Sequence, residues 1–175
     1  GLNVNAGANV SAQNCLFGDA GICSAYLFAG GEYHFNHCDF VNYWTGSRGG
    51  PALGIKNYFE VDGTTYIRNI VNSDLRNCIV YGSIDKELEV DSLQFGTFDM
   101  IFDYNHMKRD EPYDYPGYTN VTWTGDPGFV DVSTRDFHLL ETSILRGKAD
   151  SMPGLSFDLE GNARSDADLG CYEFN

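Results

Sequence analysis

The sequence predicts an all-β fold in which successive turns of the chain stack as a solenoid, a parallel β-helix with coils of about 20–27 residues. Three observations support it. A short pattern around a cysteine recurs at residues 10–17, 33–40 and 75–80. These runs alternate apolar and polar residues, are rich in β-branched and aromatic side chains, and end at Gly, Asn, Asp or Ser. No long segment combines a 3.6-residue period with a helix cap, so we expect little helix.

The coils are placed by weaker copies of the same pattern at residues 57–59 and 102–105. The positions taken as equivalent are Cys15, Cys38, Tyr58, Cys78 and Asn105. Turns are expected at residues 19–21, 29–31, 46–50 and 62–63, where Gly, Asp and Ser gather. An antiparallel sandwich is the alternative, but it requires more hairpin dipeptides than the chain contains.

Stacking predicts two columns of like residues. Cys15, Cys38 and Cys78 would form an inward column, and an amide ladder at the turns would use Asn14, Asn57 and Asn77. The chain has five cysteines and no Cys-x-x-Cys. We expect free thiols, because neighbours on in-register strands rarely have disulfide geometry, and no structural zinc site.

The last fifty residues carry a series of ordered motifs. Their sequences are Asp-Pro-Gly-Phe-Val-Asp at 126–131, Asp-Phe-His-Leu at 136–139, Thr-Ser-Ile-Leu-Arg-Gly at 142–147, Asp-Leu-Glu-Gly-Asn-Ala-Arg at 158–164 and Asp-Leu-Gly-Cys-Tyr-Glu-Phe at 168–174. This order resembles the C-terminal region of secreted bacterial right-handed parallel β-helix proteins of the pectate-lyase-like superfamily. The chain departs from that pattern at Ile144, Arg146 and Cys171.

The resemblance implies a right-handed β-helix in an exported, carbohydrate-related setting, so we expect a secreted or outer-surface protein. Residues 1–125 would form the coils, and residues 126–175 the final coil and a C-terminal capping segment of the same domain. In that cap, Arg164 is expected to bind the carboxylate of Asp158 or Asp168. The chain begins without Met or a targeting segment, so we expect that upstream coils of a longer protein precede it.

The net charge of the chain limits the classes of partner that it can bind. Asp and Glu number 25 against 11 Lys and Arg, giving a formal net charge of -14. Such a surface repels phosphate backbones and anionic lipids, so we expect no nucleic-acid partner. The apolar runs are also too short to span a bilayer. A polysaccharide or surface glycan is the expected partner.

Aromatic residues in two loops are the expected glycan-binding residues. Tyr43 and Trp44 precede a Gly-rich stretch with Arg48, and a Pro- and Gly-containing insertion holds Tyr113, Tyr115, Tyr118 and Trp123. Aromatic faces bordered by polar groups suit sugar rings, which have apolar faces and hydroxyl edges. Alternatively, the tyrosines only seal the loop against the wall of the solenoid.

Carboxylates define a second candidate region. Asp99 and Asp103 are four residues apart on one strand, about 13 Å, which is too far for a catalytic pair. A neighbouring coil would place Glu87, Glu89 or Asp91 beside them, facing outward. Such a group is a candidate Ca²⁺ site or simply a solvated face; we expect no other cofactor and assign no catalytic residue.

The sequence therefore favours an exported or cell-surface β-helix module for carbohydrate-associated binding or scaffolding, without a complete active site in this chain. The alternative is a polysaccharide lyase or glycoside hydrolase. Among the basic residues only Lys108 and Arg109 adjoin, which gives the lyase no cationic groove. A structural stalk is the third possibility.

Overall fold

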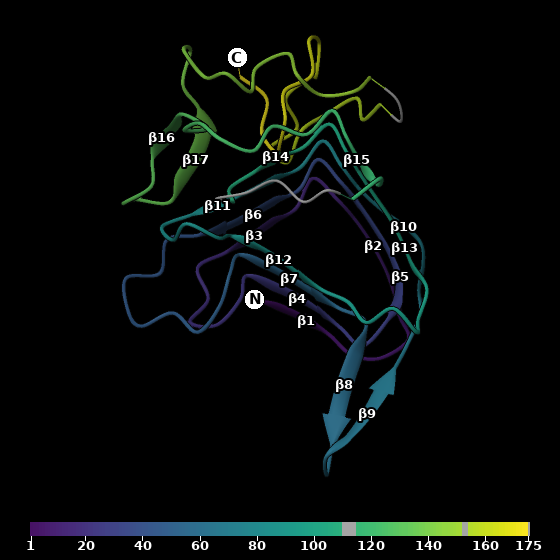
Figure 1. The fold of residues 1–175 in the computed structure, drawn as a ribbon. Helices are drawn as coiled ribbons and strands as arrows, with labels where there is room; N and C mark the ends of the chain where they lie inside the picture. Colours follow the sequence, from purple (N-terminus) through teal and green to yellow (C-terminus); the bar gives the residue numbers. More distant parts are fainter. Residues whose placement is uncertain (110–114, 152–153, 175) are drawn as a thin grey trace.

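The computed structural model describes residues 1–109, 115–151 and 154–174, and within these ranges the protein is all-β with no helix (Figure 1). Three parallel sheets make up most of it. Sheet A contains β1 (Leu2–Val4), β4 (Ala25–Phe28), β7 (Leu53–Lys56) and β12 (Leu88–Asp91). Sheet B contains β2 (Ala8–Gln13), β5 (Gly31–Asn36), β10 (Ile70–Arg76), β13 (Phe98–Asp103) and β15 (Tyr118–Thr119). Sheet C contains β3 (Leu16–Gly18), β6 (Asp39–Asn42), β11 (Ile79–Gly82) and β14 (His106–Met107).

The chain visits the three sheets in turn. Each round contributes one strand to sheet A, one to sheet B and one to sheet C, and the next round pairs with it in parallel. Figure 1 shows the three sheets surrounding a common interior. Alternate side chains of the strands fill it, among them Leu27, Phe35 and Phe102, all fully buried. No helix of the described residues is long and apolar enough to cross a membrane.

The corner between sheets B and C repeats in every round. The corner residue has a positive φ at five positions whose strands are in register. Asn14, His37, Asn77, Tyr104 and Asn120 have φ of 49°, 51°, 55°, 52° and 51°. Asn tolerates this left-handed conformation better than most residues, which explains its recurrence. The expected shared corner is right for Asn14 and Asn77, but the amide ladder is wrong, because Asn14 Nδ2 donates to the Phe157 carbonyl and Asn77 Nδ2 to Asn36 Oδ1. Asn57 follows β7 and bonds Leu93 at another corner.

The cysteine column is confirmed. Cys15, Cys38 and Cys78 follow the corner residue in successive rounds, and the Cys38 amide donates to the Cys78 Sγ at 3.3 Å. All five cysteines are free. Burial raises the pKa of the Cys78 thiol well above its usual range, so this thiol is an interior packing group.

One predicted coil position is wrong. Tyr58 does not occupy the cysteine level, because it begins an antiparallel hairpin, β8 (Tyr58–Val61) and β9 (Thr64–Ile67), that projects from the corner between sheets A and B (Figure 1). Asp62 and Gly63 form its turn with φ of 49° and 74°. The third round is therefore longer than predicted, with 40 residues separating Cys38 from Cys78.

The C-terminal part does not lie over the last round, as the cap was expected to. The hairpin of β16 (Phe129–Asp131) and β17 (Asp136–Leu139) packs on the outer side of sheet C, where Val41 and Ile79 meet Phe137. Residues 156–174, the C-terminal clamp, then follow the corner between sheets B and C. They reach the first round, where Asn14 Nδ2 donates to the Phe157 carbonyl at 2.7 Å.

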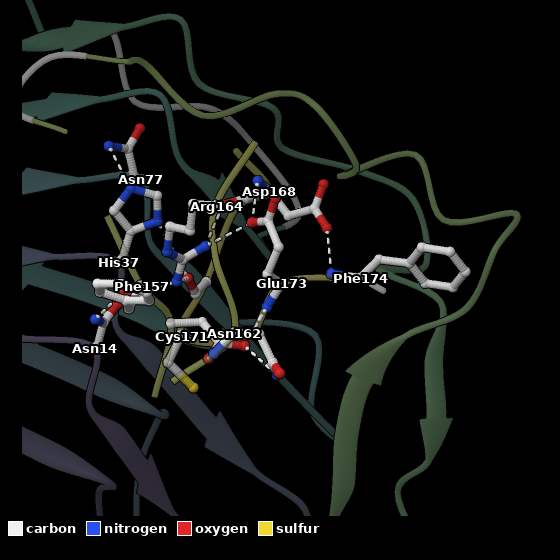
Figure 2. A network of polar contacts seen from close by, with 12 residues as sticks. Asn14, His37, Asn77, Phe157, Asn162, Arg164, Asp168, Cys171, Glu173 and Phe174 are labelled. Atoms are coloured by element: carbon white, nitrogen blue, oxygen red, sulfur yellow. Dashed lines mark hydrogen bonds and ion pairs between the residues drawn. The ribbon is translucent and has the colours of Figure 1, made fainter. Parts of the chain in front are cut away.

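The clamp is held by a buried polar network (Figure 2). Arg164 pairs with Glu173 at 3.0 Å and also donates to Asn14 Oδ1 and the Gly170 carbonyl. The expected partners Asp158 and Asp168 instead accept backbone amides, for example those of residues 160 and 174. The cap prediction named the right arginine and the wrong carboxylate, because the three acids are equivalent in sequence and only the fold decides which one is buried beside it.

Candidate functional site

The predicted loop at residues 43–48 is divided between the interior and the surface. Tyr43 is partly buried, with its ring 6.0 Å from that of Phe137. Arg48 is also buried, its side chain 6% exposed, and its two terminal nitrogens bind Glu87 at 2.8 and 2.6 Å. Trp44 remains 45% exposed. Of these three residues, only Trp44 is an exposed side chain that could contact a ligand.

The structure contradicts the predicted orientation of Glu87 in the acidic face. It was expected to point outward with Glu89 and Asp91, but its side chain is fully buried and also accepts the Ala52 amide at 2.8 Å. Strand β12 begins only at Leu88, so the alternation does not extend back to Glu87. Asp91 binds Lys56 and the Tyr58 hydroxyl. The described residues contain no group of three or more His, Cys, Asp or Glu that could hold a metal ion.

The second predicted aromatic group closes the end of the interior. The Tyr118 ring lies 4.7 Å from Phe102 and 4.8 Å from Trp123, and Tyr115 packs against Tyr118 at 5.5 Å. All three pack on the core that the strands enclose. This is the sealing role considered for the tyrosines, although Trp123 also lines a surface cavity. Tyr113 lies outside the described residues.

A row of surface rings, half-buried at Tyr26, Phe28 and Phe59 and exposed at Tyr66, forms a candidate site that the sequence patterns did not predict. Tyr26 and Phe28 on β4 have ring centroids 5.5 Å apart, Phe28 lies 6.2 Å from Phe59 on β8, and Phe59 lies 5.0 Å from Tyr66 on β9. The rings thus run from the outer face of sheet A onto the projecting hairpin. Each has a neighbour close enough for a favourable aromatic contact.

Local sequence explains each part of the row. Strand β4 alternates, with Ala25 and Leu27 buried inside and Tyr26 and Phe28 outside. Gly54 is the neighbour of Tyr26 on β7, and a Cβ there would lie 2.6 Å from the tyrosine ring, so the ring rests over the glycine. On the hairpin, Phe59 and Tyr66 are a directly opposed cross-strand pair.

The row continues toward Trp44 across a cavity of about 430 Å³. Its lining includes Leu2, Asn3, Ile22 and Tyr26. Ile22 is 70% exposed, and the indole nitrogen of Trp44 lies beside the adjoining Gly21. We call the whole set the aromatic band: Trp44, Ile22, Tyr26, Phe28, Phe59 and Tyr66.

Charged groups border the band. Lys56 lies 4.0 Å over the Tyr58 ring and 3.3 Å from Asp91, and Arg68 lies 5.6 Å over the Phe59 ring. Both cations therefore contact aromatic rings on the hairpin. The signal that could have found the band was the Tyr-Leu-Phe alternation at residues 26–28 together with the Asp-Gly turn at residues 62–63.

The outer face of sheet B carries a ladder of paired charges. Arg76 donates to Asp74 at 3.1 Å and to Asp103 at 3.0 Å, and His34 contacts both Asp74 and Glu32. The hydrogen bonds to Asp74 and Glu32 raise the pKa of His34. Asp103 was expected to meet acids of the Glu87–Asp91 strand; its partner on the neighbouring strand is Arg76, because β10, and not β12, pairs with β13.

No protein-family model matches this chain, and comparison with curated proteins and with solved structures found no match. Function is therefore inferred from the geometry and charge of these surfaces.

Proposed function

We propose that this chain is a right-handed parallel β-helix of the pectate-lyase-like kind, exported to the medium or to the cell surface, and that it binds polysaccharide through the aromatic band. Three parallel sheets visited in turn by the chain support the β-helix. The motifs of the last fifty residues support the superfamily and the exported setting.

The aromatic band is the observation that carries the binding function. Four of its rings, on β4, β8 and β9, contact one another in series, and Tyr66 is 41% and Trp44 45% exposed. Sugar rings pack their C–H faces on aromatic rings and direct their hydroxyls to polar neighbours. Asn3, Lys56 and Asp91 supply such neighbours along sheet A. An extended glycan chain fits a series of rings better than a single small ligand does.

A glycan-array screen, with and without millimolar Ca²⁺, tests this function. Binding is expected for at least one polysaccharide, and the double variant Tyr26→Ala, Tyr66→Ala should weaken it by at least about tenfold. Phe95→Ala is the matched control, because Phe95 is 92% exposed and lies outside the band. Binding that survives the double variant, or an array without a hit, would contradict the proposal; the latter would favour the stalk.

Glycoside hydrolysis is the second candidate function, favoured by one observation. Asp74 and Asp103 lie on the same half-buried outer face of sheet B and share Arg76, so two carboxylates are close together. A reducing-end assay on any glycan that binds, with Asp103→Asn as the inactive comparison, separates an enzyme from a binding module. Formation of unsaturated uronate would instead indicate the lyase.

A further inference from the structure

A second surface cavity shares no lining residue with the cavity of the aromatic band, and it has both aromatic and polar walls. It measures about 220 Å³ and is lined by Tyr81, Asp85, Lys108, Arg109, Trp123, Thr124 and Gly125. None of these residues belongs to the aromatic band. We propose that this cavity binds one neutral sugar ring, such as the end of a glycan chain, independently of the band.

The aromatic walls have fixed orientations. Tyr81 on β11 stacks on the His106 ring at 5.6 Å, with 17° between the ring planes. His106 is itself held by Thr122 at 2.8 Å and by the Gly125 carbonyl at 3.0 Å. The Trp123 ring packs edge-on against Tyr118 at 4.8 Å. Walls that are ordered before binding reduce the entropy lost when a ligand binds.

The polar groups favour a neutral polyhydroxylated ring. Asp85 is exposed and offers acceptors to hydroxyl groups, while Lys108 offers donors. The Lys108 ammonium lies 4.9 Å over the Tyr81 ring and donates to the Gly82 carbonyl at 2.9 Å, which holds it at the rim. An anionic ligand would gain from Lys108 and Arg109 but would be opposed by Asp85 and by the net charge of -14.

The volume of the cavity limits how many sugar rings it can hold. Sites for drug-sized ligands measure roughly 300–1,000 Å³. A cavity of about 220 Å³ is smaller and accommodates a single ring. The extended band and this cavity would therefore recognise different features of a glycan, its length and its end.

The chain has two tryptophans, one at each site, which makes the test direct. In Trp44→Phe, Trp123 is the only tryptophan, and its fluorescence reports the cavity. Glucose, galactose, mannose and N-acetylglucosamine are titrated to about 100 mM, a range that reaches weak affinities. We expect a saturable change in Trp123 fluorescence with at least one of these sugars. The affinity should be at least about tenfold weaker when Asp85→Ala is added and unchanged when Glu141→Ala is added; Glu141 is an exposed acid of the C-terminal part.

Three results would overturn the inference. They are no saturable change with any of the four sugars, a change that Asp85→Ala leaves intact, and tighter binding of glucuronate than of glucose, which would make the cavity an anion site. The complementary variant Trp123→Phe reports the band through Trp44. Failure at the cavity and failure at the band are therefore distinguished in separate titrations.

Discussion

The C-terminal clamp and the aromatic band invert the usual distribution of polar and apolar groups. Beneath the clamp, charged and amide groups such as Arg164, Glu173 and His37 are buried. Across sheet A and the hairpin, large rings remain at the surface. Buried polar groups are costly unless they are paired, and exposed apolar bands are unusual unless something binds them. The comparison teaches that the polar groups of the first region are satisfied within the fold, whereas the rings of the second region keep accessible surface, which is the basis of the proposed binding role.

Hydrogen bonding completes this contrast. His37 is neutral, because burial first and the nearby Arg164 second lower its pKa to about 4, and it bonds both Asn77 and the Gly170 carbonyl. Nearly every polar atom of the clamp has a partner; Arg164 Nε has none in the described structure. The rings of the band are packed mainly on one another, so we expect substitutions there to lower stability less than substitutions in the clamp.

The largest expected effect is at Arg164. Arg164→Met leaves the Glu173 carboxylate buried without its cation, which should lower the free energy of unfolding by about 3–5 kcal/mol. Chemical denaturation measures the change, and hydrogen exchange should show lost protection in residues 156–174. Arg68→Met, at an exposed arginine, is the control. Equal stability of the two variants would contradict a structural role for the network.

The buried carboxyl of Asp39, which contacts the clamp, should make the stability of the protein depend on pH. Burial raises its pKa to about 7, and its oxygens bond the amide and the thiol of Cys171; Arg164 and His138 are the cations that act on it. Because the folded pKa exceeds the unfolded value, Asp39 favours folding below about pH 4, and that contribution is lost as the pH rises through 7.

Asp39→Asn should remove this dependence and stabilise the protein at pH 8 by about 2–4 kcal/mol relative to the wild type. The two proteins should differ less at pH 4. Denaturation curves at several pH values measure the difference between them, which cancels the other titrating groups. A constant difference from pH 4 to pH 8 would show that Asp39 does not titrate in this range.

Gly54 tests whether the arrangement of the band matters. Gly54→Ala places a methyl group 2.6 Å from the Tyr26 ring, which must move. We expect a cost of about 1–3 kcal/mol and weaker glycan binding, although no atom of the band is removed. Gly63→Ala, at the hairpin turn, also strains the backbone but leaves open space around its Cβ and is the comparison. Unaltered glycan affinity in Gly54→Ala would exclude a role for the Tyr26 orientation.

The smallest effect is expected at His34, on the half-exposed ladder of sheet B. Its raised pKa means that it stabilises the fold below its unfolded pKa, and that this contribution is lost as the pH rises through the folded value. Solvent screening limits the change in His34→Gln to less than about 1 kcal/mol. An NMR titration of the imidazole checks the direction of the shift; a pKa below the ordinary value would contradict it.

Short-range patterns were sufficient for the strands. The alternation in residues 33–40 and 98–103 agrees with the residues of β5 and β13 that face inward, and the recurring cysteines predicted the column beside the corner between sheets B and C. These properties depend on each residue and its immediate neighbours, since pleating and left-handed corner conformations are local. The same logic misplaced Tyr58, because residues 57–59 imitate the repeat although they begin a hairpin.

The sequence by itself therefore determined the all-β class, the free thiols and the residues available for each face. The tertiary structure decided the partners: Glu87 is buried because Arg48, from the preceding round, reaches it, and Arg164 takes Glu173 although two nearer-looking acids were equally available. It also assembled the aromatic band from three separate segments. Pairing energies and burial depend on which distant segments meet, and one-dimensional spacing does not contain that information.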